Sequence, residues 1–197
     1  MKGILIVAGL SGMLIPALAS AELNYNSVSA GFTTKTTKTN NIEQNYSELS
    51  LGISKSVFKN IYLGASFESG TQPGTPTTGG KMVHSISLGA GFHTPLNDNV
   101  DVIVASHIVQ GSDKIAGSSA NANGYDIGAG IRAQTTYGLE GSIVAVYDSI
   151  SNDTYSSKDT FINAQFGFDF TPKIQMYGGI DLFRDNQTID LGLRFFY

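Results

Sequence analysis

Acidic side chains are the groups in this sequence whose type and spacing could do chemistry. Six of them occur in segments where polar and apolar residues alternate, and each lies on the polar face of its segment. The six are Glu48, Glu68, Asp126, Asp148, Asp181 and Asp190. Carboxylates that gather around an opening attract cations and repel anions. Whether these six gather depends on the elements that carry them.

Histidine and cysteine give little indication of a catalytic or metal-binding site. The three histidines are His84, His93 and His107, and the chain has no cysteine. Ser106 and His107 are neighbours, so a strand would point them to opposite faces, although His107 could approach Asp126 or Ser85. A hydrolase needs a nucleophile, a base and an orienting group, and three scattered histidines do not make a metal site. The glycines follow the period of a strand and form no phosphate-binding motif. We therefore expect no enzyme activity and no cofactor.

The residues around these acids follow a period of two, which indicates β-strands. In GYDIGAGIRAQ, for example, Ile127 and Ile131 share one face, whereas Asp126 and Arg132 share the other. Ten segments are predicted to be strands: 23–35, 45–57, 60–70, 81–94, 99–110, 123–136, 138–149, 159–171, 173–184 and 187–197. The fifth segment includes VDVIVASHIV, which is apolar on both faces, so its register is the least defined.

Strand length and connection length separate two all-β architectures. The predicted strands span about 11–14 residues, whereas strands of soluble sandwiches are typically about 5–6 residues long and membrane-spanning strands need about 9–11. Segments near 36–44, 71–80, 111–122 and 150–158 are polar and long, and the connections between them are short. This alternation is typical of a transmembrane antiparallel β-barrel. A closed barrel also leaves no unpaired edge in lipid.

The first 21 residues are predicted to be a secretory signal peptide. Lys2 precedes an apolar run, and Ala19-Ser20-Ala21 matches a cleavage site before Glu22. The alternative, an uncleaved anchor, fits less well because Pro16 interrupts the run. Residues 22–197 would then form a single domain. Removing Lys2 leaves 11 basic against 16 acidic residues, a net charge of −5, which argues against nucleic acid as a partner.

The chain ends in IDLGLRFFY, with alternate apolar residues and a terminal aromatic residue. These positions are Ile189, Leu191, Leu193, Phe195 and Tyr197. The pattern resembles the C-terminal assembly signal of Gram-negative outer-membrane β-barrel proteins. The resemblance implies an outer-membrane location, periplasmic termini and recognition by the barrel-insertion machinery. Small members of the OmpA or OmpX type have eight strands, so eight strands is the alternative to the ten counted here.

Periplasmic termini would orient the polar faces. The six acids would then lie near the outer mouth, with Arg132 and Arg194 towards the periplasm. Small residues on the inward face, such as Gly89 and Gly91, would leave room for water. We therefore predict a narrow, porin-like passive pore with cation preference. Tyr62 and Tyr177 also point inward and could close it, so a closed barrel with a structural or surface-interaction role, as in an adhesin or receptor, is the alternative.

Basic residues near the predicted outer loops suggest one further partner. They are Lys35, Lys38, Lys81, Lys114 and Lys158. Paired contacts between lysines and the phosphates of lipopolysaccharide would stabilise the rim of the barrel. Ordinary solubility of the loops is the alternative explanation. The loops are poor in the aromatic residues that dominate protein interfaces, and we expect a monomer.

Overall fold

Ten antiparallel strands make up the protein. The computed structural model describes residues 25–39, 42–75, 79–115, 118–135, 138–152, 156–182 and 186–197, so the predicted signal peptide lies outside the described residues. The strands are β1 (Ser27–Thr39), β2 (Ile42–Phe58), β3 (Ile61–Thr75), β4 (Gly79–Asn97), β5 (Val100–Ile115), β6 (Ser118–Gln134), β7 (Leu139–Ser151), β8 (Ser156–Thr171), β9 (Ile174–Leu182) and β10 (Asn186–Phe196). The prediction of ten strands is confirmed, and the alternative of eight is wrong.

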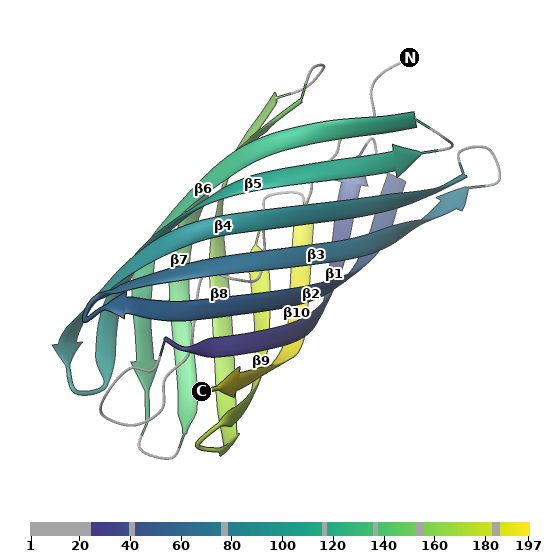
Figure 1. Ribbon diagram of the computed structural model, residues 1–197. Helices are drawn as coiled ribbons and strands as arrows, with labels where there is room; N and C mark the ends of the chain where they lie inside the picture. Colours follow the sequence, from purple (N-terminus) through teal and green to yellow (C-terminus); the bar gives the residue numbers. More distant parts are fainter. Residues whose placement is uncertain are drawn as a thin grey trace.

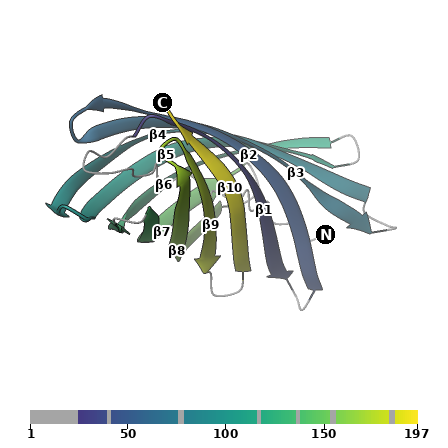
Figure 2. The same ribbon diagram turned by 90° about the horizontal axis from the view of Figure 1, so that it is seen from below.

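The sheet closes on itself. Each strand pairs with its sequence neighbours, and β10 pairs with β1 through a register that runs from Ser27 opposite Phe196 to Thr37 opposite Asn186. Figure 1 shows the long, tilted strands, and in Figure 2 the neighbours β8, β9, β10, β1 and β2 lie side by side in that order. The start of β1 and the end of β10 define what we call the terminal end of the barrel. The other end is the opposite end.

Apolar residues cover the outside of this barrel. Leu49, Ile108 and Phe166 are 64%, 64% and 63% exposed, whereas the inward residues of the same strands, such as Glu48 and His107, are buried. The outward faces predicted from the alternation are confirmed. Such a surface suits lipid and would be costly in water. No helix in the described part of the chain is long and apolar enough to cross a membrane.

The long polar loops predicted at the opposite end are largely strand. β2 begins at Ile42, β3 runs to Thr75, β5 runs to Ile115 and β6 begins at Ser118. These extensions are rich in Ser, Thr and Asn, with little apolar alternation. Periodicity could not detect them, because it marks only strands with one apolar face. Thr nevertheless suits strands through its branched side chain, and pairing with the neighbouring strand supplies the backbone hydrogen bonds.

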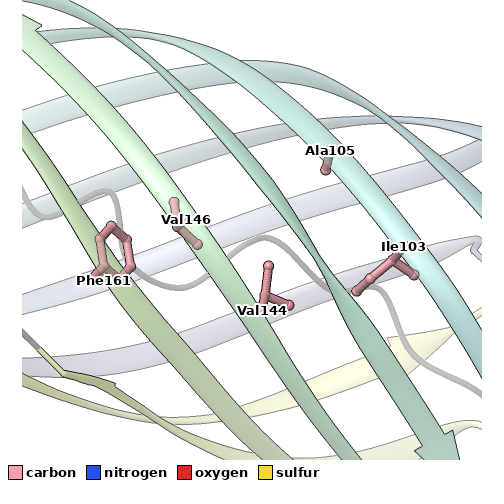
Figure 3. Packing of buried hydrophobic residues seen from close by; sticks show 5 residues of the cluster. All are labelled: Ile103, Ala105, Val144, Val146 and Phe161. Carbon is pink, nitrogen blue, oxygen red and sulfur yellow. The ribbon is translucent and has the colours of Figure 1, made fainter.

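The apolar inward face of β5 belongs to a small cluster on one wall of the lumen. The cluster comprises Ile103, Ala105, Val144, Val146 and Phe161 (Figure 3). β6 lies between β5 and β7, and its Gly130 and Gly128 sit in register with the cluster residues of both neighbours. Side chains from β5 and β7 therefore meet over these glycines. This explains why β5 has apolar residues on both faces.

Candidate functional site

The candidate site is the barrel lumen, and large side chains fill much of it. A Cβ atom on Gly91 would overlap the ring of Tyr62, and one on Gly89 would overlap the ring of His107. Tyr177 lies in the same way over glycines of β1 and β10. The prediction that small inward residues leave room for water is wrong at these positions. The missing side chains instead make space for neighbouring rings.

A network of polar and aromatic side chains crosses the lumen at the terminal end. Tyr25, which precedes β1, is 1% exposed. Its ring stacks on Tyr62 at 4.8 Å and lies 4.0 Å from the ring of His93, and its hydroxyl donates to Asp101 at 3.4 Å. The guanidinium of Arg132 lies 5.6 Å from the centre of the Tyr25 ring. Because β6 is five places from β1 around the barrel, this contact spans the lumen.

The network continues around the other half of the wall. Arg132 Nε donates to Glu140 Oε1 at 3.0 Å, and Gln175 Nε2 donates to Glu140 Oε2 at 2.9 Å. Arg194 donates to Gln175 Oε1 at 2.7 Å and lies over the ring of Tyr177. We call the whole group the terminal belt. Its members are Tyr25, Tyr62, His93, Asp101, Arg132, Glu140, Asp169, Gln175 and Arg194. The belt pairs each of its acids with a donor.

Hydrogen bonds from neighbouring strands hold the first residues of the belt in place. Ser54 Oγ donates to the carbonyl oxygen of Tyr25, and the backbone N–H of Ser56 donates to Asn26 Oδ1 at 3.2 Å. The N–H of Tyr197 donates to the carbonyl oxygen of Asn26 at 3.2 Å. The chain thus enters β1 with the Tyr25 side chain fixed inside the lumen.

The six predicted acids all face the lumen, on the side of the belt away from the termini. Their side chains are buried: Glu48 5%, Glu68 9%, Asp126 2%, Asp148 4%, Asp181 0% and Asp190 3% exposed. Five of them interact electrostatically with Lys35. The sixth, Asp126, accepts a hydrogen bond from His107 Nδ1 at 2.8 Å. We call these six acids, Lys35 and His107 the acidic compartment. The prediction placed the acids on the correct face and allowed His107 to approach Asp126, but it did not place Lys35 among the acids.

Lys35 does not fit the predicted contact with lipopolysaccharide. Its side chain is 2% exposed and lies in the lumen. The sequence prediction placed it at the end of a strand, beside a loop, but β1 continues to Thr39. Lys35 shares the inward face with Thr33, two residues earlier. Lys158 is exposed. The side chains of Lys38, Lys81 and Lys114 lie outside the described part of the chain.

Three aspartates and a histidine form a row around part of the acidic compartment. His107 is opposite Asp126, Asp126 is opposite Asp148, and Asp148 is opposite Asp159. Like charges directly opposite on adjacent strands destabilise a sheet. Asp148 Oδ1 accepts the backbone N–H of Asp159 at 3.1 Å. Ser85 donates to Glu68 Oε2 at 3.1 Å, whereas the sequence had allowed it to approach His107.

The wall formed by β8, β9, β10 and β1 carries further polar side chains. Thr33 Oγ1 donates to Asp190 Oδ1 at 2.6 Å, and Asn163 Nδ2 donates to Asp181 Oδ1. Thr188 is opposite Asp181 on one side and Lys35 on the other. These hydroxyl and amide groups were not singled out from the sequence. Strand parity is the signal that could have found them, since each lies on the polar face of its strand, as Thr188 does with Asp190 on β10.

The five residues of the predicted assembly signal lie on the outward face of β10. Ile189, Leu191, Leu193, Phe195 and Tyr197 are 46–58% exposed. Phe196, between the last two, is buried in the lumen at 2% exposure. The predicted pairing of this terminal strand with the first is confirmed. The role of the five residues in assembly stays a prediction.

Comparison with known proteins shows that this chain is similar in fold to solved outer-membrane barrels. No family model and no curated protein matches the sequence. An outer membrane channel from Pseudomonas putida F1 is similar over 92% of this chain and 97% of its own, with a TM-score of 0.55 and 14% identity. The β domain of the Bordetella autotransporter Brka is similar over 88% of this chain and 100% of its own, with a TM-score of 0.58 and 10% identity. The chain therefore has the fold of the outer-membrane β-barrel proteins of Gram-negative bacteria.

Proposed function

We propose that this protein is a narrow passive pore with cation preference in the bacterial outer membrane. The observation that carries the proposal is the acidic compartment, in which six buried carboxylates share the lumen with Lys35 and His107. Burial of charges of one sign is costly unless partners, water or counter-ions compensate them. Mobile cations supply this compensation. The compartment would thus concentrate cations and exclude anions.

The terminal belt would limit the rate of conduction. Its side chains cross the lumen and are nearly inaccessible, with Arg132 and Gln175 at 0% exposure. If the termini lie in the periplasm, the acidic compartment faces outward and the belt forms the inner constriction. Ten strands also fall between the eight that side chains can fill and the sixteen that leave a wide channel. The similar fold of an outer membrane channel supports this assignment.

A closed barrel with a structural or surface-interaction role is the second candidate. The contact between Arg132 and Tyr25 favours it, because aromatic and charged side chains from opposite walls meet across the lumen. The low exposure of the inward residues favours it as well. The two candidates differ in whether ions pass the belt.

Single-channel recording decides between them. Protein purified from the outer membrane of an expressing host is placed in a planar bilayer with a salt gradient. We expect small, steady, cation-selective steps whose selectivity falls in Asp181→Asn and Asp190→Asn and is unchanged in Asp98→Asn, which alters an exposed turn. Tyr25→Ala should increase conductance. Silence of the folded wild type and of folded Tyr25→Ala would exclude the pore and leave the closed barrel.

Assembly and lipid contact are separate proposals about partners. The outward face of β10 would be recognised by the barrel-insertion machinery, so deletion of Tyr197 or the change Phe195→Asp should impair membrane assembly. Lys158 would contact lipopolysaccharide at the outer rim. Normal insertion of both β10 variants, measured by heat-modifiable migration of the folded barrel on gels, would refute the assembly role.

A further inference from the structure

Three neighbouring strands place oxygen-bearing side chains in a grid on one wall of the acidic compartment. In one row Asn163 of β8 is opposite Asp181 of β9, which is opposite Thr188 of β10. In the next row Gln165 is opposite Gly179, which is opposite Asp190. These rows are adjacent because inward residues recur every second position along a strand. The members with side chains are at least nine-tenths buried.

Several of these oxygens have no hydrogen-bond partner within the described part of the protein. They are Asn163 Oδ1, Thr188 Oγ1 and Asp190 Oδ2. Each belongs to a side chain no more than 3% exposed. Buried polar atoms are nearly always paired, so three unpaired oxygens on β8 and β10, the two strands that flank β9, call for a ligand.

Gly179 lies in this grid without a side chain of its own. A Cβ atom added there would lie 3.6 Å from Asp190 Oδ2 and 2.9 Å from Gln165 Cγ. The free oxygen of Asp190 therefore leans over the glycine towards the middle of the grid. The other Asp190 oxygen is held by Thr33 at 2.6 Å, which fixes the orientation of the carboxylate.

We propose that this grid binds a hard divalent cation such as Ca²⁺. Asn163, Thr188 and Asp190 would supply their unpaired oxygens, and the carboxylate of Asp181 would add charge. Ca²⁺ takes six to eight oxygen ligands in flexible geometry and accepts neutral amide oxygens and water besides carboxylates.

The local charge favours a divalent ion over a monovalent one. Five carboxylates, those of Glu48, Glu68, Asp148, Asp181 and Asp190, interact electrostatically with one ammonium group, that of Lys35. Carboxylates therefore outnumber this ammonium group. A divalent cation offsets more of the surplus negative charge per ion than a monovalent cation does.

The donor set differs from a site made only of strong metal ligands. No group of three or more His, Cys, Asp or Glu side chains among the described residues is arranged to hold a metal ion. Neutral oxygens from Thr188 and Asn163 complete the proposed site. Such a set favours Ca²⁺ over transition metals, which prefer imidazole and thiolate ligands.

The inference deepens the proposed cation preference and shares its acidic compartment. Binding nevertheless does not require conduction, so the two can fail separately. Calcium binding by a barrel that is silent in the bilayer would retain the site and exclude the pore. Cation-selective conduction without calcium binding would retain the pore and exclude the site.

Calorimetric titration of the purified protein in detergent with CaCl₂ tests the proposal. We expect about one Ca²⁺ per barrel. Thr188→Val should bind Ca²⁺ at least about tenfold more weakly, which is the effect of losing a supporting group at a metal site. Thr188→Val keeps the shape of the side chain and removes only the hydroxyl. Its matched control is Thr34→Val, which removes an exposed, outward hydroxyl on β1.

A second variant keeps the test informative if Thr188→Val fails to fold. Asp190→Asn keeps an oxygen for Thr33 but removes the charge, and it should also weaken binding at least tenfold, by the same reasoning. Calcium should raise the melting temperature of the wild type and of Thr34→Val and have little effect on Thr188→Val. The proposal is overturned if the wild type shows no calcium binding, or if Thr188→Val binds as tightly as Thr34→Val.

Discussion

The terminal belt and the acidic compartment lie in the same lumen but treat buried charge in different ways. In the belt, Glu140 accepts from Arg132 and Gln175, and Asp169 accepts from Gln134 and Gln175. In the compartment, neutral groups such as Thr33 and Ser85 donate to the carboxylates, and among the described side chains only Lys35 is named as a cation against five of them. Paired buried charges rigidify a structure, whereas a surplus of one sign attracts ions. The belt therefore suits closure, and the compartment suits cation accumulation.

Loss of Lys35 should break the compartment most severely. Lys35→Met removes an ammonium group that interacts with five carboxylates, and loss of one partner of a buried charge pair costs about 3–5 kcal/mol. We expect that loss in the free energy of unfolding at neutral pH, measured by urea unfolding in detergent micelles. Acidification should reduce the deficit, because protonated carboxylates no longer repel one another. Wild-type stability at neutral pH would contradict this view of the compartment.

The tight packing of the belt can be tested at Gly91. Gly91→Ala places a methyl group against the ring of Tyr62, and such overpacking costs about 1–3 kcal/mol. Gly141→Ala is the matched control, because a Cβ atom there meets nothing within 4 Å. The same unfolding measurement should separate the two variants. Equal stabilities would mean that the Tyr62 ring can move without cost.

Neutralising one carboxylate should change the free energy of unfolding in opposite directions in the two regions. Asp148→Asn removes like-charge repulsion from Asp126 and Asp159 across strands, a term of about 0.2–1 kcal/mol, and should stabilise the barrel by that amount. An asparagine Oδ1 can still accept the N–H of Asp159. Glu140→Gln should destabilise the barrel, because Glu140 accepts from Arg132 and Gln175. Unfolding curves for both variants at the same pH give the comparison, and a common sign would remove the distinction between the regions.

The smallest expected effect is stabilisation of the barrel by calcium, which should act through the acidic compartment and not through the belt. If the proposed cation balances the compartment, millimolar CaCl₂ should stabilise the wild type against urea, and EDTA should reverse the effect. The gain follows from mass action and grows with the ratio of free calcium to the dissociation constant. Gln134→Ala removes a donor to the belt residue Asp169 and should retain the full calcium effect. Its loss there would mean that calcium acts through the belt.

The fold was predictable to the level of strands and faces. Period two identified ten strands, and the parity of Glu48, Asp126 and Asp190 placed them correctly inside the barrel. Strand extensions beyond the apolar band were missed, because polar residues on both faces leave no period. That error placed Lys35 at the end of a strand beside a loop, where it was expected to contact lipid, instead of in the lumen. Inward Gly91 was interpreted as free space, because a sequence cannot show that a ring from the neighbouring strand occupies it.

The alternation of residues along the chain was enough to predict that apolar residues cover the outside of a ten-stranded barrel, that acids face its inside and that the last strand can pair with the first. These follow from local alternation, which the two-residue period of a strand converts directly into faces. Which inward side chains meet became clear from the folded barrel. The contact of Arg132 with Tyr25 and the grid around Gly179 join residues that are distant in sequence, and their positions depend on barrel closure and strand register.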